Sequence, residues 1–178
     1  MIRQADLSDL NLLIQVDLKD EGITSTTAAE LSEEDLFDHR TKIMKFITDK
    51  DRGVFIYEDK NSKKRLGLLM YSIVNRDAVY PWKTIFHELD RRLFQVDGRF
   101  IEIFQLWVDP NHRRLGIATE LKQTLEDIAS SHDIHLIYTH TEEQNLHVIE
   151  LNSKLGYKEV RRGPIWDEVI RVSLIKQL

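Results

Sequence analysis

A strong β-strand that leads through a short loop into an amphipathic helix constrains the fold of this chain more than any other feature. The strand, FIEIFQLWV at 100–108, is rich in β-branched and aromatic residues and ends at the turn signal Asp-Pro-Asn. The loop holds Arg113, Arg114 and Gly116, and the helix after it repeats apolar residues at helical spacing. A further strand is predicted at 134–138. A β-loop-α-β unit of this kind is typical of layered α/β proteins.

The residues before this unit predict a strand, two helices and a hairpin. The strand is expected at 1–5, and apolar residues at helical spacing from Leu10 onward predict a helix behind it. Ser32 can cap a second helix. Two strand-like runs, 54–57 and 66–74, are joined by the turn-rich DKNSKKR and predict a hairpin.

The rest of the chain completes an alternating pattern. An extra helix is expected in 75–99, because apolar residues recur there at helical spacing: Trp82, Phe86, Leu89 and Leu93. Another helix is expected from Asn145 to Gly156, followed by strands at about 157–162 and 168–175. We therefore expect an α/β fold whose mixed central sheet of about six to seven strands is flanked by helices on both faces.

Composition limits the possible functions. The chain has 178 residues and no cysteine, so it can bury a core without disulfides, and thiolate zinc sites and cysteine nucleophiles are excluded. The net charge of −5 argues against sequence-independent binding to nucleic acid or to anionic membranes. The first residues lack a targeting pattern, and the longest apolar run, 66–74, is too short to span a bilayer. We expect a soluble cytoplasmic protein with a single domain over 1–178.

The loop before the central helix has the features of an anion site. Gly116 allows a ligand to approach the backbone, and the first N–H groups and the positive dipole end of the helix favour phosphate. Arg113 and Arg114 add positive charge. From the residues alone, a plain connection with surface arginines is an equally good interpretation. The loop is neither a Walker motif nor a dinucleotide fingerprint.

Two segments of the chain resemble one known family. The run RRLGIA at 113–118 is similar to the R/Q-x-x-G-x-G/A pyrophosphate motif of the Gcn5-related N-acetyltransferase (GNAT) family. Farther along, NLHVI at 145–149 and LGY at 155–157 resemble the second segment of that family, and both segments occur in the expected order and spacing. The resemblance implies a GNAT-like acyl-CoA N-acyltransferase fold over nearly the whole chain.

The resemblance also implies acetyl-CoA as the cosubstrate. The strand backbone at Leu106, Trp107 and Val108 would pair with the pantetheine arm, as an added strand does. Asn145 occupies a position whose side chain contacts pantetheine in the family, and a plain helix N-cap is the alternative role. The residues whose backbone would hold the pyrophosphate are Arg113, Arg114, Leu115, Gly116, Ile117 and Ala118.

Catalysis requires a neutral amine that attacks the thioester carbonyl carbon. An alkylammonium with a pKa near 10.4 is neutral in about one molecule in 2,500 at pH 7, so a base or a water relay is expected. Glu102 lies eleven positions ahead of Arg113, where the resemblance places the general-base glutamate of several family members. Its apolar neighbours predict partial burial, which raises the pKa of a carboxyl group. An ordinary outward-facing strand residue is the alternative.

The sequence departs from the family pattern at Asn152. Many members place there a tyrosine that protonates the departing thiolate. Asparagine has no ionisable proton, but it can hydrogen-bond the sulfur or the pantetheine, and a thiolate with a pKa of about 8.5 can take its proton from solvent. We therefore assign Asn152 both a catalytic and a cofactor-binding role, with the neighbouring Tyr157 as a weaker alternative acid.

Other motifs carry weaker arguments. The histidines His132, His135, His140 and His147 form no HExxH motif, so we expect packing or surface histidines and no metal. No GxSxG elbow favours a serine hydrolase. The basic residues at 112–114 lie in an acidic chain, so no nucleic-acid partner and no membrane partner is expected.

The acceptor is expected to be a primary amine, of a small molecule or a peptide. The polar segment at 19–31 contains Asp20, Glu21 and Glu30. The helix expected in 75–99 carries Trp82, Glu88 and Asp90, and the two stretches would form an acidic lid with an aromatic wall that suits a cation. Solvated helix faces are the alternative interpretation.

The sequence therefore predicts an acetyl-CoA-dependent N-acetyltransferase. This transferase would move the acetyl group by direct attack within a ternary complex, as a monomer or a homodimer. Two alternatives stay open: a non-catalytic acyl-CoA-binding or sensing module with the same fold, and a phosphate-binding α/β protein outside the family.

Overall fold

A computed structural model describes residues 1–23, 27 and 29–178 of the chain. The chain divides into two compact units. The first comprises Met1–Tyr71 and Gln105–Leu121, and the second comprises Ser72–Phe104 and Lys122–Leu178. Within the described part of the chain, no helix is long and apolar enough to cross a membrane.

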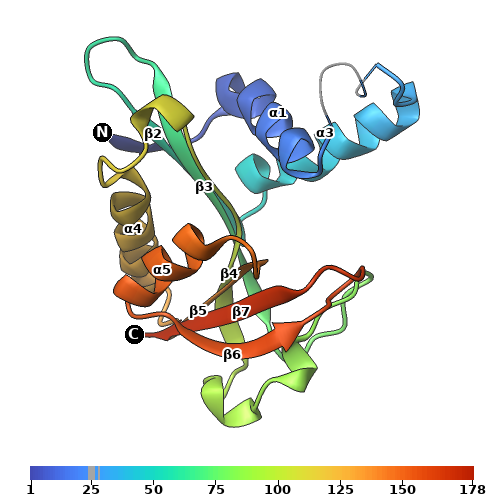
Figure 1. Cartoon of the computed structure of the whole chain (residues 1–178), viewed down its shortest axis with the longest axis vertical. Helices are drawn as coiled ribbons and strands as arrows, with labels where there is room; N and C mark the ends of the chain where they lie inside the picture. Colours follow the sequence, from blue (N-terminus) through green and yellow to red (C-terminus); the bar gives the residue numbers. More distant parts are fainter. Residues whose placement is uncertain (24–26, 28) are drawn as a thin grey trace. The chain divides into compact units, whose positions relative to one another are not determined.

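The elements alternate between strands and helices much as the sequence pattern predicts (Figure 1). The strands are β1 Ile2–Gln4, β2 Arg52–Glu58, β3 Arg65–Asn75, β4 Arg99–Val108, β5 Leu136–Glu142, β6 Lys158–Gly163 and β7 Arg171–Gln177. The described α-helices are α1 Leu10–Asp20, α3 Glu33–Thr48, α4 Ile117–Ser131 and α5 Leu146–Lys154. Short 3-10 helices are η1 Leu7–Asp9, η2 Phe86–Glu88, η3 Arg91–Leu93 and η4 Pro110–His112.

The strands form one seven-stranded sheet in the order β1-β2-β3-β4-β5-β7-β6. Strands β4 and β5 run parallel, whereas β5 and β7, β6 and β7, and β1 and β2 pair in antiparallel fashion. The expected mixed sheet of six to seven strands is therefore confirmed.

In the first unit, α1 and α3 lie side by side and pack on β2 and β3 (Figure 1). The buried cluster between them consists of Leu10, Leu13, Val16, Ile43, Phe46, Val54, Ile56, Leu68 and Met70. Helix α3 begins where the sequence predicts, because the side chain of Ser32 accepts a hydrogen bond from the backbone N–H of Asp35 at 3.0 Å. Leu36, near the start of α3, is exposed.

Helix α4 begins on the opposite face of β3. A Cβ atom built on Gly67 would lie 2.7 Å from Cγ2 of Ile117 and 3.3 Å from Cδ1 of Leu121. Gly67 and the adjacent Leu68 point to opposite faces of the strand, and Leu68 faces α1 and α3. Helices therefore flank the sheet on both faces, as predicted.

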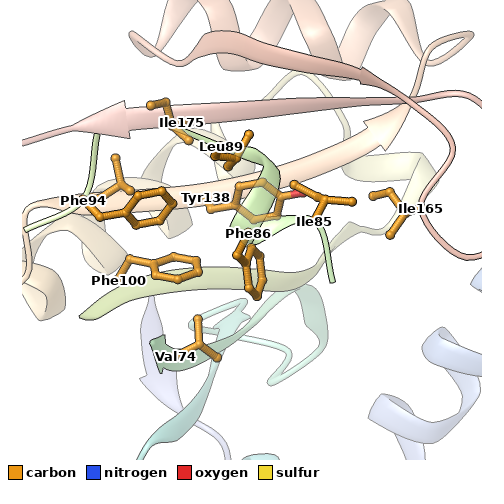
Figure 2. Packing of buried hydrophobic residues seen from close by; sticks show 10 residues of the cluster. Val74, Ile85, Phe86, Leu89, Phe94, Phe100, Tyr138, Ile165 and Ile175 are labelled. Carbon is orange, nitrogen blue, oxygen red and sulfur yellow. The ribbon is translucent and has the colours of Figure 1, made fainter. Parts of the chain in front are cut away.

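Aromatic side chains pack against one another in the core of the second unit (Figure 2). Phe86 meets the rings of Phe100 and Tyr138 edge-on, with centroids 4.8 Å and 5.4 Å apart, and Phe94 lies 5.1 Å from Phe100. Edge-to-face pairs of this kind each contribute about 1 kcal/mol beyond the burial of their area. This cluster fixes the positions of β4 and β5 side chains on one face of the sheet.

The prediction of an extra helix in 75–99 is wrong. The segment contains the two single turns η2 and η3 instead. Its carbonyl groups bond arginine side chains rather than N–H groups four residues later: Arg76 donates to the carbonyls of His87 and Leu89, and Arg91 donates to the carbonyl of Gln95 at 2.9 Å. Side-chain donors thus satisfy carbonyl groups that a helical ladder would otherwise satisfy, and Arg76 does so from a position 11 and 13 residues away.

The apolar spacing of this segment reflects packing rather than helical structure. Phe86 and Leu89 are buried in the aromatic cluster, and Leu93 is partly buried against it. Trp82 is 51% exposed and stacks on Tyr80, with ring centroids 4.9 Å apart. A spacing of three to four residues also suits consecutive turns that lie on a sheet, which explains the misleading pattern.

Candidate active site

The loop that precedes α4 has an unusual backbone. Arg114 has φ +61° and Gly116 has φ +83°, so two nearby residues adopt the left-handed conformation. Left-handed residues occur in the concave nests of N–H groups that bind anions. Arg114 is not a glycine, and its conformation costs on the order of 1 kcal/mol, a strain typical of functional loops. A Cβ atom on Gly116 would meet nothing within 4 Å, so the loop is open at this point.

The loop combines this backbone with exposed side chains. Arg113, Arg114 and Leu115 are exposed, and Arg113 contacts the carbonyl of Val108 at 3.5 Å. Ile117 and Ala118 form the first turn of α4, where N–H groups have no partner within the helix and the dipole is positive. The predicted pyrophosphate residues thus form one continuous, open and positively charged structure in the first unit.

Asp109 holds this loop in place. Its backbone N–H donates to the carbonyl of Leu66 in β3 at 2.9 Å, and its side chain accepts from the N–H of Asn111 at 3.0 Å. The ammonium of Lys64 lies 2.8 Å from the carboxylate. The bond from Lys64, and next that from Asn111, lower the pKa of Asp109, so the anchor stays ionised.

Gly67 is a second anchor, and the sequence reasoning missed it. The glycine lets the first turn of α4 approach β3, and a Cβ there would also lie 3.2 Å from the carbonyl oxygen of Trp107. A glycine inside an otherwise apolar strand is the available signal, because it commonly marks a close approach of other backbone.

Leu106, Trp107 and Val108 occupy the last part of β4 and are half-buried. Trp107 packs against the apolar cluster of the first unit. The registered parallel pairs of the described residues are Ile101 with Ile137 and Glu102 with Tyr138, and β4 continues beyond them. The three residues therefore lie beyond the part of β4 that is in register with β5. Backbone that pairs with a ligand on this side must not already pair with β5.

Glu102 lies in the second unit, half-buried in β4 between the buried residues Ile101 and Ile103. It stands opposite Tyr138 of β5, so the two side chains share a face of the sheet. The partial burial predicted for Glu102 is confirmed. Burial, and in a smaller measure the negative charge of Glu102, raise the pKa of the Tyr138 hydroxyl, which keeps this hydroxyl protonated at neutral pH.

His140 joins this face and was not predicted as a site residue. The hydroxyl of Tyr138 lies 3.0 Å from Oγ of Ser173 and 3.4 Å from Nδ1 of His140, and the imidazole meets the ring of Trp166 edge-on at 5.3 Å. Burial, and next the charge of Arg171, lower the pKa of His140 to about 4. The imidazole is therefore neutral at pH 7, and the same burial makes it a weak proton acceptor.

Asn145 does not act as the expected side-chain cap of α5. Its side chain makes no capping bond and donates instead to Oγ1 of Thr141 at 3.2 Å. Thr141 and His140 are adjacent in β5 and point to opposite faces. The structure therefore does not bring Asn145 to the face of β5 that carries His140.

Asn152 is buried in α5, at 1% exposure. Its amide nitrogen donates to the carbonyl of Val148 at 3.0 Å, and its Oδ1 has no hydrogen-bond partner among the described residues. A buried carbonyl oxygen without a partner is costly. Asn152 thus offers an acceptor, not an acid.

Two further buried groups lie where α4 meets the start of β6. The ammonium of Lys122, at 1% exposure, lies 4.2 Å from the centroid of the Tyr157 ring. Neither polar atom has a hydrogen-bond partner among the described residues. Burial lowers the pKa of Lys122 to about 7 and raises the pKa of Tyr157. Tyr157 is thus a packing residue and a poor acid.

One described group has the composition of a metal site. Ligand atoms of Asp17, Glu21 and His39 lie within 4.8 Å of one another. His39 already bonds Asp17 at 2.6 Å, and the ammonium of Lys42 lies 3.5 Å from Glu21 and 3.7 Å from Asp17. A lysine ammonium thus supplies the positive charge that a metal ion would bring.

The predicted acidic lid at 19–31 is only partly described, because residues 24–26 and 28 lie outside the described part of the chain. Asp20, Glu21 and Glu30 are exposed, and Glu21 pairs with Lys42. Trp82 does not lie on a helix, so the expected aromatic wall is not formed in the predicted way.

The comparison with protein families decides the class of the chain. The model of the acetyltransferase (GNAT) family matches residues 20–157. The chain belongs to the GNAT acetyltransferase family. The match includes both the loop before α4 and the second segment in α5, the two segments on which the resemblance was based.

Solved structures with the same fold cover nearly the whole GNAT chain. NAA60 of Arabidopsis thaliana in complex with acetyl-CoA has a TM-score of 0.74 at 17% identity, over 100% of this chain and 98% of that chain. The same enzyme with a bisubstrate analogue has a TM-score of 0.73 at 18% identity, over 99% and 97%. A variant of spermidine N-acetyltransferase SpeG of Vibrio cholerae has a TM-score of 0.67 at 18% identity, over 99% and 94%. At these identities the likeness concerns the fold. No curated protein matches the chain.

Proposed function

We propose that this GNAT acetyltransferase transfers the acetyl group of acetyl-CoA to a primary amine. The observation that carries the proposal is the open loop before α4, with left-handed backbone at Arg114 and Gly116. Its N–H groups and arginines suit a pyrophosphate. We further propose that the whole chain works as one domain, because β3 and β4 each supply residues to both units.

The reaction is a direct attack within a ternary complex. The amine nitrogen forms a bond to the thioester carbonyl carbon, the bond from that carbon to sulfur breaks, and the thiolate leaves. The amine must lose a proton first, and its pKa near 10.4 makes this unfavourable at pH 7. A positioned base that takes this proton contributes about 10² to 10⁴ in rate.

Glu102 is the proposed base. Its half-buried carboxylate lies between apolar residues on a strand whose position is fixed by the aromatic cluster. His140 is the alternative base on the same face, and a weaker one, because the burial that keeps its imidazole neutral disfavours uptake of a proton. Replacing Glu102 and His140 one at a time shows which of the two acts as the base.

In this mechanism Leu106, Trp107 and Val108 pair with the pantetheine arm, and Asn145 contacts it. The unpartnered Oδ1 of Asn152 accepts a hydrogen bond from the cosubstrate, and the thiolate takes its proton from solvent, which its pKa of about 8.5 allows. A non-catalytic acyl-CoA-binding module is the second candidate, and the same observation favours it, since Asn152 supplies no acid.

Thermal unfolding with acetyl-CoA, free CoA and ATP tests the cosubstrate. Binding at a hundred times Kd adds about 2.7 kcal/mol of stability, a rise in Tm of roughly 5 to 10 °C for a chain of this size. Gly116→Glu places bulk and negative charge in the loop and is expected to abolish the shift.

Gly22→Glu is the matched control for this variant. Gly22 has φ +77° and also has open space around its Cβ position, so both substitutions introduce the same strain and charge. A shift that survives Gly116→Glu, or one that both variants abolish equally, would contradict the assignment of the loop. Release of free thiol with an amine present then separates the enzyme from the binding module.

A further inference from the structure

One face of the second unit leads from the proposed base to an exposed pocket. Tyr138, His140 and Glu142 occupy alternate positions of β5 and therefore share a face. In the same register, Ser173 of β7 stands opposite His140, and Arg171 stands opposite Glu142. Exposure increases along this row, from buried Tyr138 through half-buried His140 to exposed Glu142. The face thus opens toward solvent at the end of β5.

An indole borders this face and is held in one position. Trp166, in the loop between β6 and β7, is 56% exposed. The guanidinium of Arg171 lies 4.1 Å from the centroid of its ring, and His140 meets it edge-on at 5.3 Å. Arg171 is itself fixed by a bond to Asp167 of 3.0 Å. A large exposed aromatic side chain that is already immobilised loses little entropy when it packs on a ligand.

The same loop borders a pocket of about 270 Å³ at the end of β5. Val169 and Ile170 are 40% and 37% exposed and are the apolar residues of its lining. The backbone N–H of Glu143 donates to the carbonyl of Ile170 at 3.0 Å and ties the loop to the strand. The remaining lining residues are Glu142, Glu143, Gln144 and Glu168.

The charge around the pocket is not balanced. Glu143 pairs with Arg162 at 3.2 Å, and Asp167 pairs with Arg171. Within the described part of the chain, Glu142 and Glu168 take part in no ion pair. Most other carboxylates that border this unit's strands have a basic partner, as Glu88 has in Arg161 and Glu126 has in Lys176. A pocket with two carboxylates outside any ion pair of the described residues, beside an exposed indole, is complementary to a cation on an aliphatic stem.

We infer that the acceptor carries a second positive charge, which enters the pocket between Glu142 and Glu168 while an aliphatic segment packs on Trp166. The inference rests on the proposed function and specifies its acceptor. Tyr138, opposite Glu102, and Glu142 are four residues apart, or roughly 13 Å along the strand. The acceptor is therefore a long diamine or polyamine, or a peptide with a basic residue about three to four positions from its reacting amine.

Acceptors of matched length and different terminal charge test this inference. Acetylation is measured by thiol release at saturating acetyl-CoA with three eight-carbon amines. Octylamine has a neutral far end, the diamine has a second amine at its far end, and the amino acid has a carboxylate there. A second series of tetrapeptides carries lysine, norleucine or glutamate at the fourth position, and it distinguishes a peptide from a small amine. In one series or the other, the cationic member is expected to exceed the neutral one in kcat/KM by roughly tenfold, and the anionic member to be the poorest.

Variants assign this preference to the pocket. Glu142→Gln with Glu168→Gln is expected to remove the advantage of the cationic acceptor through KM and to leave kcat with octylamine unchanged. Asp127→Asn with Asp133→Asn removes two exposed charges elsewhere in the same unit and is expected to keep the preference. Trp166→Ala is expected to raise KM for charged and neutral acceptors alike, and Trp166→Phe to restore most of the loss.

Each outcome decides the inference. Equal kcat/KM for cationic and neutral members in both series overturns it, and so does a preference that survives the double glutamine variant. If amines are acetylated without a charge preference, only this inference fails. If acetyl-CoA does not bind, or no amine is acetylated, the proposed function fails with it.

Discussion

The loop before α4 and the face around Glu102 differ in which part of the chain performs the proposed task. The loop presents main-chain N–H groups, shaped by left-handed backbone at Arg114 and Gly116, and its side chains are exposed. The face presents side chains, Glu102, Tyr138 and His140, whose positions depend on neighbouring strands and on the aromatic cluster. A site made of main-chain groups keeps its ligand when side chains are changed and loses it when the backbone conformation changes. A side-chain site fails at single substitutions that leave the fold intact.

The largest expected effect is on the side-chain site. Glu102→Gln keeps the shape of the side chain and removes its ability to take a proton. We expect turnover to fall by roughly 10² to 10⁴, because general-base catalysis contributes about that factor. The Kd of acetyl-CoA should stay within a few-fold of the original value, since Glu102 is not one of the proposed cofactor-binding residues. Steady-state thiol release and thermal shift measure the two quantities.

His140→Gln is the companion variant in the same assay. A large loss with His140→Gln and an unchanged rate with Glu102→Gln would identify the imidazole as the base. Loss of acetyl-CoA binding in Glu102→Gln would contradict the separation of the two regions.

Helix α4 connects the two regions, and its buried Lys122 is expected to make stability depend on pH. Burial lowers the pKa of Lys122 from 10.5 to about 7, so the folded chain binds fewer protons than the unfolded chain between these values. The free energy of unfolding then rises as pH increases through this window, and the cost of the buried amine is greatest below pH 7. The charge of Glu126 raises this pKa and offsets part of the cost, whereas the charge of Lys176 lowers it, and burial outweighs both.

Lys122→Met replaces the buried amine with an apolar side chain of similar length. At pH 7 we expect the variant to be more stable by an amount on the order of 2 to 4 kcal/mol, an upper range set by 1.36 kcal/mol per pKa unit. The gain should shrink as pH rises toward 9. Urea unfolding at several pH values measures both effects, and the exposed Lys154→Met serves as the control. A difference between Lys122→Met and the original protein that does not change with pH would refute the titration of Lys122 in this window.

The sequence predicted those features that depend on a few neighbouring residues. The cap at Ser32 and the left-handed Gly156, with φ +89°, are set by local backbone preferences. The run at 113–118 resembles the family motif and lies within the family match, so the main-chain site proposed there is one that consecutive residues can indicate. Glycine and charge within six positions are enough to indicate it.

Features that depend on distant residues were missed. The turns in 85–93 replace a helix because Arg76 bonds their carbonyl groups, and no local pattern records such a bond. The surroundings of His140 are made by the register of β5 with β7 and by Trp166, which lies in a later loop, and burial there lowers the pKa of its imidazole. The part of the site that is made of side chains is therefore the part that sequence reasoning describes least well.

The smallest expected effect tests whether the loop acts through its backbone. Arg114→Gly removes one positive charge and relieves the strain of φ +61°. Because a left-handed non-glycine residue costs about 1 to 2 kcal/mol, and glycine adds unfolded-state entropy worth about half of that, we expect a net gain of roughly 0.5 kcal/mol in the free energy of unfolding. Arg113→Gly is the matched control, since Arg113 has φ −70° and its replacement removes the same charge without relieving strain.

The same two variants test which groups bind the cosubstrate. If the main chain holds the pyrophosphate, each variant raises the Kd of acetyl-CoA by less than about tenfold, because the N–H groups remain in place. A loss of affinity beyond about a hundredfold in Arg114→Gly alone would show that the guanidinium is the main ligand. The loop would then resemble the face around Glu102, and the contrast between the two regions would disappear.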